Sequence, residues 1–127
     1  MSKVVKFGGS SLADAKQFKK VADIIHADPE RKYVVPSAPG KRFKEDTKVT
    51  DMLYRCYDEV AVQGKDFAEA FAPIRERYNG IISDLGLSLS LDEEFEKIGE
   101  NFRAAAGSDY AASRGEYLNG IVLANYL

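Results

Sequence analysis

The sequence has few of the residues that make disulfides or zinc sites. It contains one cysteine, Cys56, and one histidine, His26. A single cysteine excludes an internal disulfide framework, and these two residues form no zinc-binding pattern. A reducing, cytoplasmic setting is therefore the simplest expectation. Cys56 falls among apolar helical positions and His26 has no partner in a catalytic motif, so we expect the first in the core and the second at the surface.

The sequence also lacks an excess of charge of either sign and any long apolar run. Its 18 Lys and Arg residues nearly balance its 20 Asp and Glu residues, for a formal net charge of −2. This balance gives no general attraction to nucleic acid. No segment has the length of a membrane span or the layout of a signal peptide. We therefore expect neither a nucleic-acid nor a membrane partner.

The first third of the sequence predicts a strand, a helix and a second strand. The β-rich run 3–7 predicts the first strand, and residues 32–35 predict the second. Between them, apolar residues at three- and four-residue steps predict an amphipathic helix, with Ser10 or Ser11 as its cap. A unit of this length places the two strands parallel, with a right-handed connection.

Helices are predicted for the rest of the chain, after a long polar loop at residues 36–48. Their apolar faces begin near Val49, Phe67, Leu91 and Tyr110. A Ser-x-x-Glu pattern at residues 90–93 predicts a capping box. Two strands make a poor sheet alone, and the chain stops on the apolar run GIVLANYL. We therefore expect an incomplete domain of the α/β class; a helical protein with a buried C-terminal helix is the alternative.

The stretch KFGGSS, which starts at Lys6, has a residue order that suits phosphate binding better than core packing. Gly8 and Gly9 let a backbone approach a phosphate closely, and the helix that follows offers free N–H groups. The lysine adds positive charge, and Ser10 and Ser11 add hydroxyl donors. The spacing is neither that of a Walker A loop nor G-x-G-x-x-G. A glycine turn with a serine cap and a surface lysine explains this stretch equally well.

Two further segments could contribute to the same site. The loop Ser37–Gly40 is expected to face KFGGSS, because loops after the carboxyl ends of parallel strands share one edge of the sheet. Thr50 either belongs to the first turn of the next helix or places a hydroxyl at this cleft. Glu116 lies in SRGE, beside a helical glycine that costs about 1 kcal/mol relative to alanine. That cost is tolerable where a ligand or backbone comes close, although a solvated glutamate is the simpler interpretation.

Taken together, the segments KFGGSSLAD, VVPSAPGKRFKEDTKVTDMLY and ASRGEYLNG resemble the N-terminal part of aspartate kinases. The segments follow in that family's order, and the resemblance covers essentially the whole chain. It implies a partial three-layer sandwich of the amino acid kinase type. It also implies an ATP- and Mg²⁺-dependent transfer of the γ-phosphoryl group to the side-chain carboxylate of L-aspartate, the first step of lysine, threonine and methionine biosynthesis.

The resemblance also assigns roles to individual residues. Lys6 would act catalytically by stabilising the transferring phosphoryl group, and Ser10 stands where the family usually has threonine. The residues assigned to ATP and its phosphates are Lys6, Gly8, Gly9, Ser10 and Ser11. Those assigned to the aspartate are Ser37, Thr50 and Glu116. The carboxylate of Glu116 suits the ammonium group of the substrate, and no residue is assigned to a metal.

In the family that the chain resembles, the catalytic domain continues beyond Leu127. Residues 1–127 are therefore expected to form its substrate-side part, without the ATP-binding half and the regulatory ACT domains. We expect the isolated chain to be inactive and the full-length protein to be a homo-oligomer. A kinase for glutamate, acetylglutamate or a nucleotide is an alternative within the same superfamily. A non-enzymatic helical interaction module is an alternative of a different class.

Overall fold

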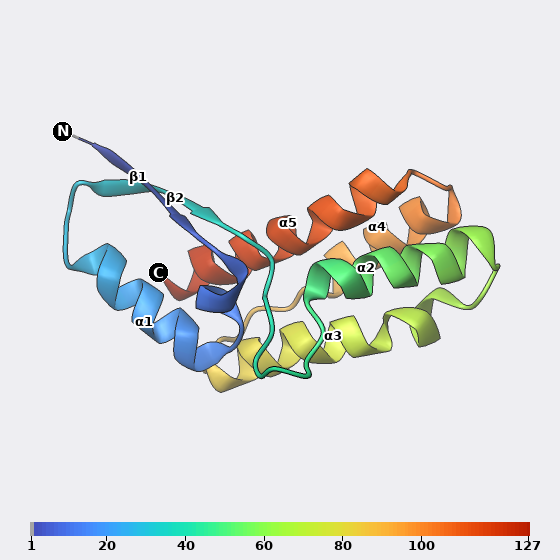
Figure 1. The fold of residues 1–127 in the computed structure, drawn as a ribbon, viewed down its shortest axis with the longest axis horizontal. Coiled ribbons are helices and arrows are strands. Elements are labelled where there is room, and N and C mark those ends of the chain that lie inside the picture. The colour runs from blue at the N-terminus through green and yellow to red at the C-terminus, as the bar shows by residue number, and fades with distance from the viewer. Residues whose placement is uncertain (1) are drawn as a thin grey trace.

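The chain begins with a strand–helix–strand unit and continues as a group of packed helices (Figure 1). A computed structural model describes residues 2–127. Its elements are β1 (Lys3–Phe7), η1 (Gly9–Leu12), α1 (Ala15–His26), β2 (Arg31–Pro36), α2 (Val49–Tyr57), η2 (Asp58–Val62), α3 (Phe67–Asp84), α4 (Asp92–Arg103) and α5 (Ser108–Tyr126). The predicted α/β class, with short strands and a helix-rich remainder, is confirmed. None of the helices in the described range is long and apolar enough to cross a membrane.

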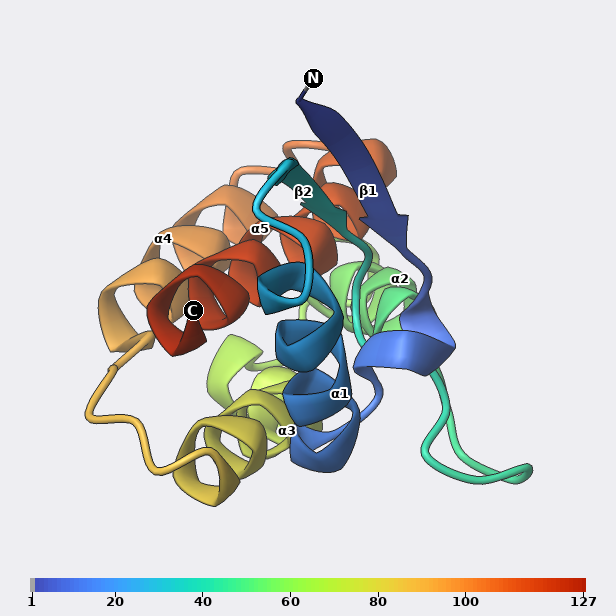
Figure 2. The ribbon, with the colours of Figure 1, turned by 90° about the vertical axis from the view of Figure 1, so that its left-hand side faces the viewer.

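The two strands are parallel, as predicted, and they pair in a register that sets Phe7 opposite Pro36. Phe7 and Val34 pack against the core on one face of the sheet. The opposite face exposes Val4 and Tyr33, which are 69% and 60% accessible to solvent. In Figure 2, α1 and α5 lie beside β2, while β1 forms the outer edge of the pair. The carboxyl ends of both strands therefore point toward the helical part of the molecule.

An aromatic cluster fills the space between the end of α2, α3 and α4. Phe67 stacks on Phe71 with ring centroids 4.8 Å apart, and Phe71 meets Phe95 at 5.2 Å. Phe102 contacts both Phe67 and Tyr57 edge-to-face, at 5.7 and 5.2 Å. Each such pair adds about 0.5–1.5 kcal/mol beyond the burial of its area. This cluster explains why three separate amphipathic segments hold a single arrangement.

The placement of Cys56 and His26 follows the sequence predictions. Cys56 is 2% exposed in the core, and His26 is exposed at the end of α1. Burial raises the pKa of the Cys56 thiol to about 12, and the nearby carboxylate of Glu59 acts in the same direction. The thiol is therefore protonated and inert at neutral pH, since the thiolate is the reactive form.

Two predicted helix caps are wrong. Ser10 and Ser11 lie inside η1, a single 3₁₀ turn, and α1 is capped by Asp14, whose carboxylate accepts from the Gln17 N–H at 3.0 Å. The capping box at residues 90–93 is also not formed. The Ser90 hydroxyl instead accepts from the Asp92 N–H at 3.3 Å. In the first case the predicted caps lie in η1, which precedes α1, and in the second Leu91 rather than Ser90 is the residue that precedes α4.

Close packing at Gly115 joins α5 to the loop after β2 and to α2. A Cβ atom at this position would lie 2.7 Å from the Cβ of Ala38 and 3.2 Å from a methyl group of Leu53. The Tyr78 hydroxyl, fully buried in α3, donates to the Gly115 carbonyl at 2.9 Å. The predicted cost of a glycine inside this helix is thus accounted for by a close approach between chain segments.

We expect Gly115→Ala to lower the free energy of unfolding, because the Cβ of Ala38 cannot rotate away from an added methyl group. Overpacking of this kind costs about 1–3 kcal/mol. Gly80→Ala in α3 is the matched control: a Cβ there meets nothing within 4 Å, so helix propensity should raise stability by about 1 kcal/mol. Urea unfolding of the two variants measures both effects. Equal stability changes would contradict the packing role of Gly115.

Candidate functional site

The loops that follow β1 and β2 lie against each other, as the sequence predicted. The Ser37 N–H donates to the Phe7 carbonyl at 3.0 Å, and the Gly40 N–H donates to the Gly9 carbonyl at 2.8 Å. A Cβ atom at Gly40 would lie 2.6 Å from the carbonyl carbon of Gly9. Only glycine fits at this contact. The two loops therefore form one continuous wall at the carboxyl end of the sheet.

The backbone of the first loop has hydrogen-bonding capacity to spare. The N–H groups of Gly8, Gly9 and Ser10 donate to no other group within residues 2–127. Gly8 has an ordinary extended backbone, φ −73° and ψ 171°, and a Cβ there would meet nothing within 4 Å. Neither backbone conformation nor packing within this range requires glycine at position 8. Three free N–H groups beside an uncrowded glycine fit the binding of an anion.

The residues predicted to bind an amino-acid substrate lie on segments that meet at the Ser37–Gly40 loop. Thr50 is in the first turn of α2, which starts where the Val49 N–H donates to the Pro39 carbonyl at 3.1 Å. Glu116 is exposed on α5, next to Gly115 and its contact with Ala38. The structure thus places all three segments around one loop.

Four of the predicted site side chains have no protein partner within residues 2–127. No hydrogen bond or ion pair joins Lys6, Thr50 or Glu116 to another side chain of residues 2–127, and the Ser37 hydroxyl is equally unengaged. Lys6 is exposed on β1, opposite Val35 of β2. Unpaired polar groups around a shared loop are available to a ligand. In the same range, no group of three Asp, Glu, His or Cys side chains could hold a metal ion.

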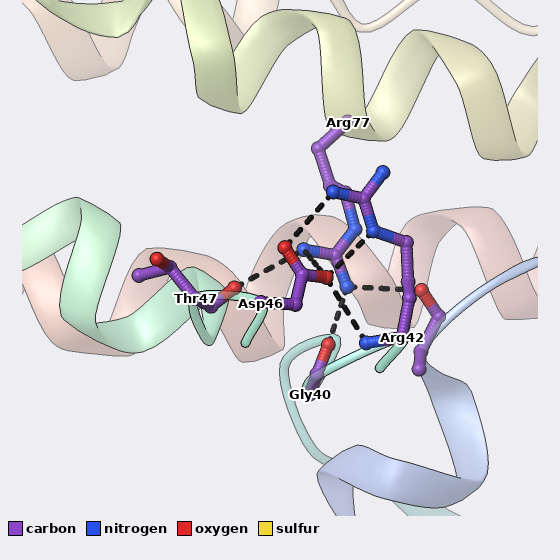
Figure 3. Close-up of polar contacts among 6 residues, drawn as sticks. Gly40, Arg42, Asp46, Thr47 and Arg77 are labelled. Carbon is purple, nitrogen blue, oxygen red and sulfur yellow. Dashed lines mark hydrogen bonds and ion pairs between the residues drawn. The ribbon is translucent and has the colours of Figure 1, made fainter. Parts of the chain in front are cut away.

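Two residues that the sequence analysis did not identify bind the backbone of the Ser37–Gly40 loop. Arg77 of α3 is 6% exposed and Asn119 of α5 is completely buried. The Asn119 amide donates to the Ser37 carbonyl at 2.8 Å, and the Arg77 guanidinium donates to the Gly40 carbonyl (Figure 3). The available signal was a polar residue on an apolar helix face, as with Arg77 between Ile74 and Ile81.

An ion-pair network surrounds Arg77. Asp46 accepts from the Nε of Arg42 at 2.6 Å and lies 3.5 Å from the Arg77 guanidinium. The hydrogen bond from Arg42 holds the pKa of the Asp46 carboxyl well below its usual range, and the Arg77 charge acts in the same direction. Burial lowers the pKa of Arg77, and the charge of Arg42 adds to that effect. Asp46 thus offsets two guanidinium groups at the end of the long polar loop.

A sizeable hollow in the described part of the chain lies elsewhere. A groove of about 960 Å³ runs between α2 and α3, and Asp46 and Arg77 line one end of it. None of the predicted site residues lines this groove. The wall formed by the two loops is an open surface by comparison, and its polar groups rather than its depth mark it as the candidate site.

Comparison with known proteins identifies the fold. The model of the amino acid kinase family matches residues 1–127. The chain belongs to this family. Aspartokinase 3 of Bacillus subtilis is 50% identical over 94 residues, which cover 72% of this chain and 20% of that protein. The crystal structure of Clostridium acetobutylicum aspartate kinase superposes with a TM-score of 0.91 at 53% identity, covering 98% of this chain and 28% of that one.

A second solved structure extends the likeness within the amino acid kinase family. Escherichia coli aspartokinase III, crystallised in complex with aspartate and ADP, matches 99% of this chain and 28% of its own chain. Its TM-score is 0.74 at 26% identity. The predicted resemblance to aspartate kinases is therefore confirmed in sequence and in structure. The chain spans about a fifth to somewhat over a quarter of these relatives.

We expect Asp46→Asn to lower stability at neutral pH and to flatten its dependence on acid. The folded-state pKa of Asp46 lies below its unfolded value of about 3.9. Its contribution is therefore fully present above that pH and is lost as the pH falls below it. Thermal melts from pH 7 to pH 2 measure the difference. Parallel stability curves for the wild type and the variant would contradict this role of Asp46.

Proposed function

We propose that the full-length protein containing residues 1–127 transfers the γ-phosphoryl group of ATP to the side-chain carboxylate of L-aspartate. The product would be 4-phospho-L-aspartate, which opens the pathway to lysine, threonine and methionine. The observation that carries the proposal is the loop whose N–H groups at Gly8, Gly9 and Ser10 have no partner within residues 2–127, set against Ser37–Gly40. The names of the relatives, aspartokinase and aspartate kinase, support this choice of substrate.

The proposed phosphate-binding residues suit this chemistry. The attacking carboxylate of aspartate is already ionised at neutral pH, so the reaction requires no general base. Catalysis then depends on positioning and on neutralising charge. The exposed ammonium group of Lys6 supplies a positive charge toward the transferring group, and the hydroxyls of Ser10 and Ser11 add donors for phosphate oxygens. When bound with the nucleotide, Mg²⁺ would neutralise further charge on the phosphates.

The proposed aspartate-binding residues offer complementary groups. The hydroxyls of Ser37 and Thr50 suit the carboxylates of the substrate, and the carboxylate of Glu116 suits its ammonium group. All three are free of protein partners within residues 2–127. A glutamate that pairs with an ammonium group distinguishes an amino acid from other carboxylates.

We further propose that the active site is formed by two different parts of the full-length protein. Residues 1–127 supply the phosphate loop and the aspartate side, while the remainder of the full-length protein supplies the nucleotide pocket. The chain alone is then inactive, and the full-length protein is a cytoplasmic homo-oligomer. The free thiol of Cys56 is compatible with a reducing compartment.

We expect Lys6→Met in the full-length protein to lower kcat by about 10²–10³-fold, the usual cost of removing a group that stabilises transition-state charge. Lys32→Met removes an exposed lysine from the neighbouring strand and should leave kcat unchanged. A hydroxylamine trap for the acyl phosphate measures both rates. If Lys6→Met retained wild-type kcat, the proposed catalytic role would be wrong.

We expect Glu116→Gln to raise KM for aspartate by about 10–100-fold, because a hydrogen bond to a charged group contributes about 1.5–3 kcal/mol. Glu100→Gln, which alters an exposed glutamate of α4, is the control. A panel of acceptors tests the substrate in the same assay. Preference of the wild type for glutamate or acetylglutamate over aspartate would refute the proposed function.

A further inference from the structure

Buried polar side chains form hydrogen bonds to both ends of the Ser37–Gly40 loop. Asn119 of α5 binds the carbonyl of its first residue at 2.8 Å, and Arg77 of α3 binds the carbonyl of its last. These are the two buried polar or charged residues identified within residues 2–127. The fold therefore places both of these residues at the two ends of a single four-residue loop.

A contribution to stability does not by itself explain why these two polar side chains are buried. The Nε of Arg77 and the Oδ1 of Asn119 are buried without a hydrogen-bond partner in the described range. An unsatisfied buried polar atom costs about 1–3 kcal/mol. Apolar residues of similar volume often replace buried charged groups with no loss of stability. The two side chains are therefore better explained by the conformation they impose on the loop than by the stability they add.

Arg77 fixes three separate segments relative to one another. Its guanidinium donates to the Ala13 carbonyl at 3.0 Å, just after η1, and to the Thr47 carbonyl at 3.3 Å, just before α2. Its third carbonyl partner is Gly40. Figure 3 shows these bonds converging on one side chain. A planar fork of five N–H donors can serve several acceptors at once, which a lysine ammonium cannot reproduce in the same geometry.

Asn119 fixes the other end of the loop and is itself held in place. The carbonyl of Gly115, one turn earlier in α5, accepts from the hydroxyl of Tyr78 at 2.9 Å. Tyr78 is the residue after Arg77. One turn of α3 therefore anchors both the far end of the loop and the helix that carries Asn119.

We propose that Arg77 and Asn119 are positioning residues for the phosphoryl transfer, acting through the Ser37–Gly40 loop. Asn119 acts on Ser37, and Arg77 acts on Gly40 and, through the Gly40–Gly9 hydrogen bond of 2.8 Å, on the phosphate loop. This inference rests on the proposed function. It predicts different kinetic effects at the two ends, because Asn119 acts only on the aspartate-binding Ser37, whereas Arg77 acts on both loops.

Arg77→Lys in the full-length protein tests the Gly40 end. We expect KM for both ATP and aspartate to rise, and kcat/KM to fall by about 10–100-fold, since small displacements of positioning groups have effects of this size. Arg75→Lys is the matched control on the same helix, where the arginine pairs with the exposed Asp92 at 3.1 Å. It should retain wild-type kinetics. A purely structural role would lower the melting temperature while leaving both KM values unchanged, and this result would overturn the proposal.

Asn119→Ala tests the Ser37 end and serves if the arginine variant does not fold. We expect KM for aspartate to rise about tenfold while KM for ATP changes little, consistent with the displacement of one binding group. Asn125→Ala is the matched control. Asn125 lies on the same helix, and its side-chain amide likewise donates to a backbone carbonyl, that of Ile121 at 2.9 Å, but the residue is exposed. Equal changes in the two KM values, or none, would contradict the proposed division.

Hydrogen exchange separates this inference from the proposed function. The amides of Ser37 and Gly40 should exchange faster in Asn119→Ala and Arg77→Lys than in the two controls, whatever reaction the protein catalyses. Faster exchange in a protein that does not phosphorylate aspartate would refute the function and retain the positioning role. Unchanged exchange at both amides would refute the positioning role even if the kinase activity is present.

Discussion

The hydrogen bonds of one buried guanidinium determine how the two halves of this molecule fit together. Arg77 joins the end of the first loop at Ala13, the second loop at Gly40 and the approach to α2 at Thr47. Each partner is a backbone carbonyl in irregular structure, where neither a strand nor a helix would otherwise fix its position. The carboxylate of Asp46 offsets the buried charge. The sheet and the helices are thus joined by a buried polar side chain within a largely apolar core.

Close contacts between backbone segments further fix the position of these loops. Gly9 and Gly40 meet with no side chain between them, and Gly115 lets α5 approach Ala38 to a distance that no larger residue allows. Since the polar groups of the candidate site stand on these same segments, their spacing is set by backbone contacts rather than by flexible side chains. The N–H groups of Gly8 and Ser10, which have no partner within residues 2–127, lie on a wall that these contacts hold. Such preorganisation is what phosphoryl transfer requires.

Periodicity in the sequence predicted the order of strands and helices, the parallel pairing and the burial of Cys56, because local apolar patterns reflect which face of an element is buried. The caps at Ser10, Ser11 and Ser90 were wrong, because α1 and α4 begin after Asp14 and Leu91, further along the chain than the local pattern indicated. Arg77 and Asn119 were missed for a related reason. Their partners lie 37 and 82 positions away, so the local pattern marks a polar residue on an apolar helix face but does not identify what it binds. The roles of Lys6 and Glu116 stay predictions.

The burial of Cys56 has a practical consequence for studying this kinase fold. Its thiol is protonated at neutral pH and shielded in the core, and it is the only cysteine in the sequence. A cysteine introduced on an exposed loop would then be the single reactive thiol of this chain. Fluorescent or spin labels could be attached there without first removing the natural residue. Cys56 would therefore not interfere with a thiol-reactive label placed on one of the loops.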